Sequence, residues 1–474
     1  MLFPTLTFAV FFVVIYPIYW FLRERGQAWK PFILAASYLF YGFWDWRFVS
    51  LIIVSTIVNQ WLAIWIAAPG YHLRRGMLVI AIIFNLGLLG VFKYYGFFTD
   101  SLNSLLHTLG LGTRLPIFEI IVPVGISFFT FQAISYVVDI YKGKLKPAPA
   151  LDFAVYLAFF PHLVAGPIVR AAEFLPQLRH PQSVDRRAAS RAVMLIAVGL
   201  FKKVVIASNL STIIVDPVFG LPGQHSALEI LLAIYGYAIQ IYADFSGYTD
   251  MAIGIALLLG ITFPQNFDRP YAATSLQDFW RRWHMTLSRW LRDYLYISLG
   301  GSRRGRLMTY RNLLLTMTLG GLWHGASLTF IAWGIFHGLG LGVERLLGER
   351  RAARGAGGTA TVIPGHPWLS RLLTFHLVCI GWVLFRADSL GSAAQMLWRS
   401  VTAWGPAPLA SINLALVIAA ALAMQYIPVR LSRRVEGALA EPPLMVQGAA
   451  LGVCIALIFA LGPKGVAPFI YYQF

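Results

Sequence analysis

The stretch NLLLTMTLGGLWHGASLTFIAWGIFHGLGLGV, residues 312–343, runs for 32 residues without an Asp, Glu, Lys or Arg. A helix needs about 20 apolar residues to cross the hydrocarbon core of a membrane, so this stretch is longer than one crossing requires. Arg311 precedes it and Arg345 follows it, and basic residues beside membrane segments stay mainly in the cytoplasm. A single crossing would place these two arginines on opposite sides. The sequence therefore predicts a broken helix in a membrane protein.

The break is expected near Trp323 and His324. Glycine is a weak helix former that permits sharp turns, and three glycines surround this pair: Gly320, Gly321 and Gly325. Histidine takes and gives protons near neutral pH, and backbone at a break can approach a substrate closely. His324 is therefore a candidate catalytic residue. His337 lies thirteen residues further on, roughly 220° round a continuous helix, so we expect it to face elsewhere and to serve packing.

The composition of the whole chain is that of a membrane protein. Hydrophobic residues make up 58% of the 474 residues and charged residues only 12%, whereas soluble domains carry about a quarter charged residues. The mean hydropathy is +0.67. The apolar runs predict an all-α polytopic membrane protein with about eleven transmembrane helices.

The net charge of +18 would indicate nucleic-acid binding in a soluble protein. Here the Lys and Arg residues fall mostly between apolar runs, which is the pattern of cytoplasmic loops. We therefore expect the lipid bilayer as a partner and no nucleic acid.

Two of the apolar runs are irregular. Residues 31–43 are too short to cross at about 1.5 Å per residue. Residues 151–169 are interrupted by Pro161 and by Gly166-Pro167, and basic loops flank them on both sides. A segment that enters and leaves on one side survives only where protein or a water-filled cavity surrounds it. We therefore predict re-entrant and interfacial helices around a cavity.

The whole chain, residues 1–474, is predicted to form a single integral-membrane domain, with residues 1–22 as its first span. Residues 348–366 are rich in Arg, Ala and Gly and are predicted to be a flexible cytoplasmic linker within it. The two cysteines, Cys379 and Cys454, lie inside apolar runs without a metal-ligand neighbour at useful spacing. Neither a disulfide framework nor a metal site is expected.

Residues 277–298 have the pattern of an amphipathic helix that lies in the membrane interface. At about 100° per residue, one face is aromatic and apolar and carries His284 near its middle, and the other is charged. His284 is the second candidate catalytic residue; the alternative is a core histidine bonded to a carbonyl group. The charged face either meets anionic lipid or binds the phosphates of a donor such as coenzyme A, and both alternatives stay open. Its arginines are Arg281, Arg282, Arg289 and Arg292.

Five other ionisable residues lie inside apolar runs: Lys202, Lys203, Asp244, Asp250 and His162. The two lysines are expected at a shallow cytoplasmic helix end, from which their long side chains reach water. The two aspartates interrupt a run of 35 residues. We expect them to line a cavity or to pair, either with each other or with Arg or Lys.

Five motifs carry a resemblance to a known family: FPHLVAGP (160–167), DFSGYTDMAIG (244–254), DFWRRWH (278–284), WLRDYLY (290–296) and GLWHG (321–325). In them the chain resembles the membrane-bound O-acyltransferase (MBOAT) family, specifically the bacterial branch that O-acetylates exopolysaccharides such as alginate. The similarity extends to the closing PFIYYQF (468–474). Related systems acetylate cellulose or peptidoglycan or D-alanylate lipoteichoic acid, so the acceptor stays open.

The resemblance implies a ring of membrane helices around a central funnel or tunnel, at whose floor the histidines meet. It implies that His324 is the invariant catalytic histidine and that His284 occupies a second site, often Asn or His. The side chains expected to line the cavity are Trp280, Trp323, Asp244, Asp250 and His162. The resemblance also implies a multi-pass protein of the bacterial inner membrane, whose periplasmic partner proteins complete transfer to a polysaccharide.

The resulting hypothesis is acetyl transfer from a cytoplasmic thioester, acetyl-CoA, without a permanently bound cofactor. His324 would act as general base, and His284 would either bond the carbonyl oxygen or orient the acceptor. The alternatives are a transporter that uses the intramembrane His and Asp residues, and a scaffold that anchors a polysaccharide machine.

Overall fold

The computed structural model of the chain is helical, and no strand occurs among the residues that it describes. These are residues 1–68, 70, 72–111, 115, 116, 118, 120–180, 182–354, 362–428, 430, 431, 434, 437, 438, 441–463 and 470. The chain divides into two compact units. The first consists of Met1–Ala188 with Ile255–Pro264, and the second of Ala189–Gly254 with Gln265–Phe474.

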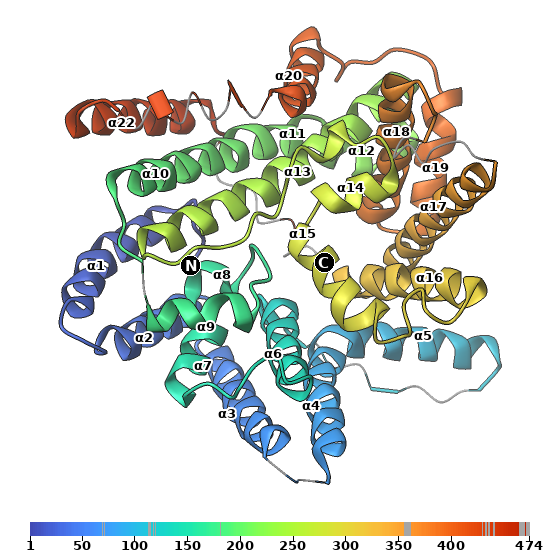
Figure 1. Ribbon diagram of the computed structural model, residues 1–474. Coiled ribbons are helices and arrows are strands. Elements are labelled where there is room, and N and C mark those ends of the chain that lie inside the picture. Colours follow the sequence, from blue (N-terminus) through green and yellow to red (C-terminus); the bar gives the residue numbers. More distant parts are fainter. Residues whose placement is uncertain are drawn as a thin grey trace. The chain divides into compact units, whose positions relative to one another are not determined.

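The first unit contains nine α-helices and one short π-helix in its described part (Figure 1). They are α1 (Leu6–Arg23), α2 (Trp29–Gly42), α3 (Arg47–Ala67), α4 (Arg74–Leu89), η1 (Gly90–Tyr94), α5 (Tyr95–Thr108), α6 (Ile126–Tyr141), α7 (Ala150–Ala158), α8 (Phe160–Leu163) and α9 (Ala171–Arg179). Helices α3, α4 and α6 pack against one another. An ion pair between Lys30 and Asp152, 2.7 Å long, joins α2 to α7, and both side chains are buried.

Residues 151–169 fold as two short helices, α7 and α8, which are separated at Phe159. Neither helix is long enough to span a membrane, and nearly every residue of the segment is buried. His162 lies on α8, and its Nε2 is 2.8 Å from the carbonyl oxygen of Tyr156. Its ring packs between Phe174 and Phe263, with ring centroids 5.5 and 5.3 Å away. Surrounding protein therefore encloses this irregular backbone, as its prolines and glycines predict.

The second unit holds the remaining helices. In chain order they are α10 (Arg186–Leu200), η2 (Phe201–Ala207), α11 (Ser208–Leu210), η3 (Ser211–Val215), α12 (Asp216–Gly220), η4 (Pro222–Gln224), α13 (Ala227–Leu258), η5 (Pro270–Ala272), α14 (Leu276–Arg282), α15 (Met285–Trp290), η6 (Leu291–Tyr296), α16 (Arg306–His324), α17 (Leu328–Ala353), α18 (Pro367–Arg386), α19 (Leu390–Thr402), α20 (Ile412–Ala423), η7 (Met424–Tyr426) and α22 (Leu444–Leu461).

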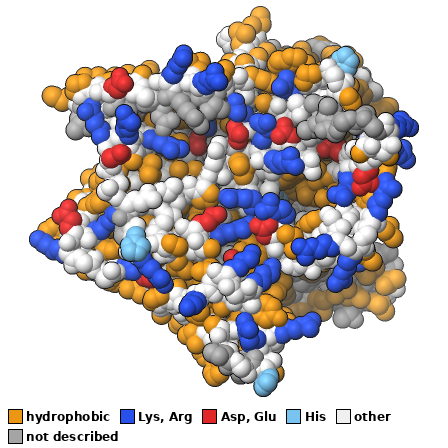
Figure 2. All heavy atoms as spheres, in the orientation of Figure 1, with side chains coloured by type: hydrophobic (Ala, Val, Ile, Leu, Met, Phe, Trp, Pro, Cys, Tyr) orange, Lys and Arg blue, Asp and Glu red, His pale blue; other side chains and the backbone are white. Residues whose placement is uncertain are grey.

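Seven helical segments of the described chain are long and apolar enough to cross a membrane. They are Leu6–Arg23, Arg47–Ala67, Arg74–Thr108, Arg186–Gly220, Ala227–Leu258, Leu328–Ala353 and Pro367–Arg386, and three shorter apolar helices accompany them. The chain is thus an all-α polytopic membrane protein. Leu6 and Val13 on α1 are 79% and 71% exposed, which suits helices that meet lipid and not water. Lys and Arg side chains are spread over the face shown in Figure 2, with apolar side chains between them.

The first residues of the predicted linker 348–366 are helical. Helix α17 continues through Gly348 to Ala353, because Arg and Ala are good helix formers. Residues 355–361 lie outside the described residues. Beyond them, the backbone N–H of Val362 donates to the carbonyl oxygen of Thr274, so the chain is tied to the segment before α14.

Candidate active site

The predicted break at His324 is confirmed, since α16 ends at His324 and α17 begins at Leu328. The two helices pack closely, and glycines make this possible. A Cβ atom at Gly321 would lie 2.2 Å from the carbonyl oxygen of Phe330, and one at Gly334 would lie 2.4 Å from that of Met317. Helices can approach this closely only where side chains are absent. Gly321 and Gly334 therefore allow α16 and α17 to pack closely, and the glycines beside His324 also permit the turn.

The predicted continuous helix over 277–298 is wrong. The structure has α14, then a break at Trp283 and His284, then α15 and η6. His284 has a φ of 41°, in the left-handed region that few residues other than glycine adopt. Apolar periodicity could not reveal this break, because the residues on both sides of it keep helical spacing.

Asn266 holds His284 in this conformation. Its backbone oxygen accepts the N–H of Met285 at 2.9 Å. Its side-chain Oδ1 accepts the N–H and the hydroxyl of Thr286 at 3.1 and 2.8 Å, and lies 3.2 Å from Nδ1 of His284. Sequence reasoning missed Asn266, which lies outside every motif and apolar run that we considered.

The same contact fixes the chemical form of His284. An amide oxygen can only accept, so Nδ1 carries the proton and Nε2 carries a lone pair. His284 is fully buried between the candidate spans, and burial lowers the pKa of its imidazole to about 3. The ring is therefore neutral at physiological pH. Among the described residues, Nε2 has no hydrogen-bond partner.

His284 and His324 both pack against one indole, that of Trp323. The ring centroid of Trp323 is 6.2 Å from that of His284 and 4.9 Å from that of His324. The two imidazoles are therefore well within the separation of about 15 Å beyond which one reaction centre could not include both. His324 is 3% exposed, and its ring also contacts Trp333 and Phe385, each at 5.2 Å.

His337 packs among aromatic rings, as expected, but it shares one of them with His324. The His337 ring packs on Trp333, which also contacts His324, and the centroids of His337 and Trp333 are 4.9 Å apart. Angles counted round one continuous helix do not apply here, because the chain turns between His324 and Leu328. Trp280 completes the group, 5.3 Å from His337 and 5.6 Å from Trp333.

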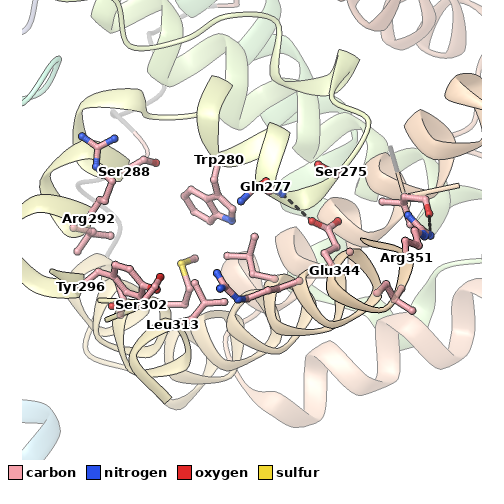
Figure 3. A pocket seen from close by; sticks show the side chains of 18 residues that line it. Ser275, Gln277, Trp280, Ser288, Arg292, Tyr296, Ser302, Leu313, Glu344 and Arg351 are labelled. Carbon is pink, nitrogen blue, oxygen red and sulfur yellow. Dashed lines mark hydrogen bonds between the residues drawn. The ribbon is translucent and has the colours of Figure 1, made fainter. Parts of the chain in front are cut away.

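A cavity of about 520 Å³ lies beside this aromatic group, between α14 and η6 on one side and α16 and α17 on the other. Figure 3 shows the indole of Trp280 projecting into it from α14. Leu291, Leu313 and Met317 form apolar parts of the wall. The polar lining includes serine and tyrosine hydroxyls, one carboxylate and three guanidinium groups: Ser275, Ser288, Ser302, Tyr296, Glu344, Arg292, Arg345 and Arg351.

The predicted arginine set is only partly gathered at this cavity. Arg292 is among the lining residues, although it also pairs with Asp293. Arg282 forms an ion pair with Asp278 at 2.8 Å, and Arg281 is exposed. Arg289 is half-buried and is not part of the lining. The sequence analysis placed Arg345 and Arg351 outside the membrane segment, in the cytoplasm. In the structure both lie on α17, which extends beyond the apolar residues of that segment.

Glu344 fixes the cavity wall. Its two carboxylate oxygens accept the backbone N–H groups of Leu276 and Gln277, at 2.6 and 3.0 Å, so a side chain of α17 caps the first turn of α14. Ser275 adds a local cap by accepting the N–H of Asp278 at 3.0 Å. Helix N-termini favour such oxygens because their first N–H groups lack partners inside the helix.

The structure confirms that the aspartates pair with lysines, whereas the expected role of the lysines needs correction. Lys203 does not reach out to water but forms a buried ion pair with Asp244, and the partly exposed Lys202 pairs with Asp250 at 2.7 Å. The partners come from the preceding helix, as opposite charges inside an apolar environment require. Asp244 also accepts the backbone N–H of Ile470 at 2.8 Å, and the rest of the closing motif lies outside the described residues. Asp244 and Asp250 are absent from the cavity lining. His162 belongs to the first unit.

Within the described part of the chain, no group of three or more His, Cys, Asp or Glu side chains is arranged to hold a metal ion. Cys379 and Cys454 are free thiols.

The helices of the described chain define a polytopic membrane protein. Residues 32–381 match the model of MBOAT, the membrane-bound O-acyltransferase family. The chain is 42% identical over 393 residues to the probable alginate O-acetylase AlgI of Pseudomonas aeruginosa, which covers 82% of this chain and 72% of that protein. It is 36% identical to the probable alginate O-acetylase AlgI of Pseudomonas putida, over the full length of both chains. It is 38% identical to the peptidoglycan O-acetyltransferase of Helicobacter pylori, over 78% of this chain and 73% of that one.

The chain therefore belongs to the membrane-bound O-acyltransferase family, and it is an O-acyltransferase.

Proposed function

We propose that this protein moves an acetyl group from a cytoplasmic thioester, acetyl-CoA, to a hydroxyl group of an extracytoplasmic polysaccharide. Transfer occurs directly or through a periplasmic partner protein, and the enzyme resides in the bacterial inner membrane. The observation that carries the proposal is the pair of buried imidazoles that both contact Trp323. The similar proteins of Pseudomonas and Helicobacter, named as O-acetylases of alginate and peptidoglycan, support acetyl as the acyl group and a polysaccharide as the acceptor.

His324 is the general base in this proposal. It removes the proton of the acceptor hydroxyl as the oxygen attacks the acetyl carbonyl carbon, and it returns the proton to the thiolate when the carbon–sulfur bond breaks. Such proton transfer contributes about 10²–10⁴-fold to rate. His284 is a poor base, since burial lowers the pKa of its imidazole to about 3.

The form of His284 supports one of its two expected roles. A carbonyl oxygen needs a donor, but Nε2 of His284 carries a lone pair because Asn266 binds the proton on Nδ1. A hydroxyl group can donate to that lone pair. We therefore assign to His284 the orientation of the acceptor through a neighbouring hydroxyl of the sugar, which donates to Nε2, while His324 alone takes the proton of the attacking hydroxyl.

The cavity beside Trp280 is the proposed donor site. Guanidinium groups bind phosphate with paired hydrogen bonds, and Arg292, Arg345 and Arg351 reach the lining from two sides. The apolar wall formed by Leu291 and Met317 suits the pantetheine arm of coenzyme A.

The transporter alternative loses support from the ion pairs. An ion path along Asp244 and Asp250 needs carboxylates that can bind a passing cation. Lys203 and Lys202 neutralise both.

The test uses purified protein in liposomes with radiolabelled acetyl-CoA, comparing the native chain with His324→Ala. We expect acetylated acceptor, or released coenzyme A, from the native chain and at least 10²-fold less from the variant. Equal signals from both proteins would remove His324 from the chemistry. If neither gives a signal, the reaction is repeated with the periplasmic components, and a second blank would reject acetyl-CoA as donor.

A further inference from the structure

His337 is the buried polar group that the mechanism above leaves unused. It is 0% exposed, and within the described part of the chain neither Nδ1 nor Nε2 has a hydrogen-bond partner. The indole N–H groups of Trp280 and Trp333, whose rings contact it, also lack acceptors among the described residues. A buried polar group without a hydrogen-bond partner destabilises the folded protein. Four such nitrogens in one cluster indicate a site at which a ligand forms hydrogen bonds with them.

The His337 ring is held on several sides. Phe279 stacks at 6.4 Å with an interplanar angle of 13°, and Trp280 and Trp333 pack edge-on at 5.3 and 4.9 Å. On α18, a Cβ atom at Gly381 would lie 2.7 Å from Nε2, so this position has to be glycine for the imidazole to fit. The ring is therefore a fixed component of the site.

This cluster lies on the way from the donor cavity to His324. The Trp280 indole lines the cavity on one side and contacts His337 and Trp333 on the other. Trp333 in turn contacts His324. A series of ring contacts, from Trp280 through Trp333, therefore links the cavity lining to His324, and His337 lies against both indoles.

The hydrogen-bond donors and acceptors of the cluster indicate which kind of ligand can bind there. Indole N–H groups only donate, and a neutral imidazole donates from one nitrogen. Donors therefore exceed acceptors, and the ring contacts of His337 come from aromatic side chains and not from charged groups. A neutral acceptor such as a carbonyl oxygen fits this set, whereas an anion would lack a counter-charge.

We propose that His337, with the indole N–H groups of Trp280 and Trp333, forms an inner subsite that binds the carbonyl oxygen at the thioester end of the donor. The proposal rests on the proposed function, since it assumes a thioester donor that enters through the cavity. A carbonyl oxygen bound there is separated from His324 by one ring, that of Trp333, which contacts both histidines.

The test compares His337→Leu with the native protein in the liposome assay, measuring KM for acetyl-CoA, kcat and the thermal midpoint. We expect KM to rise about tenfold, the effect of one lost hydrogen bond, while the thermal midpoint stays or rises because an unsatisfied buried group is gone. Trp280→Phe, which keeps a ring but loses the N–H, should raise KM as well. His337→Asn and His337→Gln place an amide near Nδ1 and Nε2 respectively, and one of them should recover the native KM.

Thr130→Val is the matched control, since the Thr130 hydroxyl on α6 is also buried without a hydrogen-bond partner among the described residues. It should leave KM and kcat unchanged. Native KM and kcat in His337→Leu would overturn the proposal and leave buried water as the occupant. A fall in kcat together with a lower thermal midpoint would also overturn it, in favour of a packing role. If the native protein shows no His324-dependent transfer from acetyl-CoA, the proposed function fails, and this inference fails with it.

Discussion

Asn266 decides more of the chemistry at the candidate site than its own reactivity would suggest. One side-chain oxygen fixes the turn after His284 and the tautomer of its ring. Strained backbone persists only where its surroundings hold it, and here the surroundings are an amide and a threonine. The proposed role of His284 as a hydrogen-bond acceptor therefore depends on Asn266 as well as on the histidine itself.

The stability of the protein should depend on pH through His284. Because the folded state holds the pKa of this imidazole near 3, below the ordinary value of 6.5, the unfolded chain binds a proton that the folded chain does not. The contribution of His284 to the free energy of unfolding is fully present above pH 6.5 and is lost as the pH falls toward 3. Between pH 7 and pH 5 the free energy of unfolding should fall by about 2 kcal/mol from this group.

The variant His284→Asn isolates that effect, since Asn tolerates a positive φ and does not titrate. Between pH 7 and pH 5, the free energy of unfolding should fall less for the variant than for the native protein. Thermal or denaturant unfolding at several pH values measures this difference. Identical slopes for the two proteins would mean that His284 is protonated, or reached by water, in the folded state.

At the scale of elements, sequence patterns predicted what depends on local composition. The break at His324 followed from length, flanking arginines and glycines, and the buried irregular segment 151–169 from its prolines and basic flanks. The break at His284, the capping of α14 by Glu344 and the position of His337 depend on contacts between elements distant in the chain. Periodicity along one helix contains no information about them.

The α16–α17 pair should be intolerant of side chains at its glycines. Gly334→Ala would place a Cβ 2.4 Å from the carbonyl oxygen of Met317, which is backbone and cannot move aside easily. We expect a loss of about 1–3 kcal/mol in stability. Acetyl transfer should fall about tenfold or more, because Trp333 and His324 shift together.

Gly342→Ala is the control on the same helix, where the new Cβ would meet only the Tyr310 ring at 3.6 Å. It should preserve activity and add a little stability, since alanine favours helix. Thermal midpoints and transfer rates of both variants check the prediction. Equal behaviour of the two would show that the close backbone contact at Gly334 is dispensable.

At the scale of the molecule, the buried charges tie long helices together. Removing one partner of a buried pair leaves an uncompensated charge and costs about 3–5 kcal/mol. Lys203→Met and Asp244→Asn should each destabilise the protein to about this degree, and the double variant should recover much of the loss. Lys202→Met should cost less, because Lys202 and Asp250 are 18% and 20% exposed, against 2% and 3% for Lys203 and Asp244.

Unfolding of these four variants in mild detergent provides the measurement. Additive losses in the double variant would mean that Lys203 and Asp244 act through other partners and not through each other.

The order of these charges along the chain also bears on how the protein is made. The segment Ala227–Leu258 has a mean hydropathy of only 1.3 and carries both aspartates, so it is a poor substrate for membrane insertion by itself. Its lysine partners lie on Arg186–Gly220, the spanning segment that is synthesised immediately before it. The lysines can therefore neutralise the aspartates as soon as the segment Ala227–Leu258 leaves the ribosome. The two segments are thus suited to leave the translocon together as a hairpin, with their charges already paired.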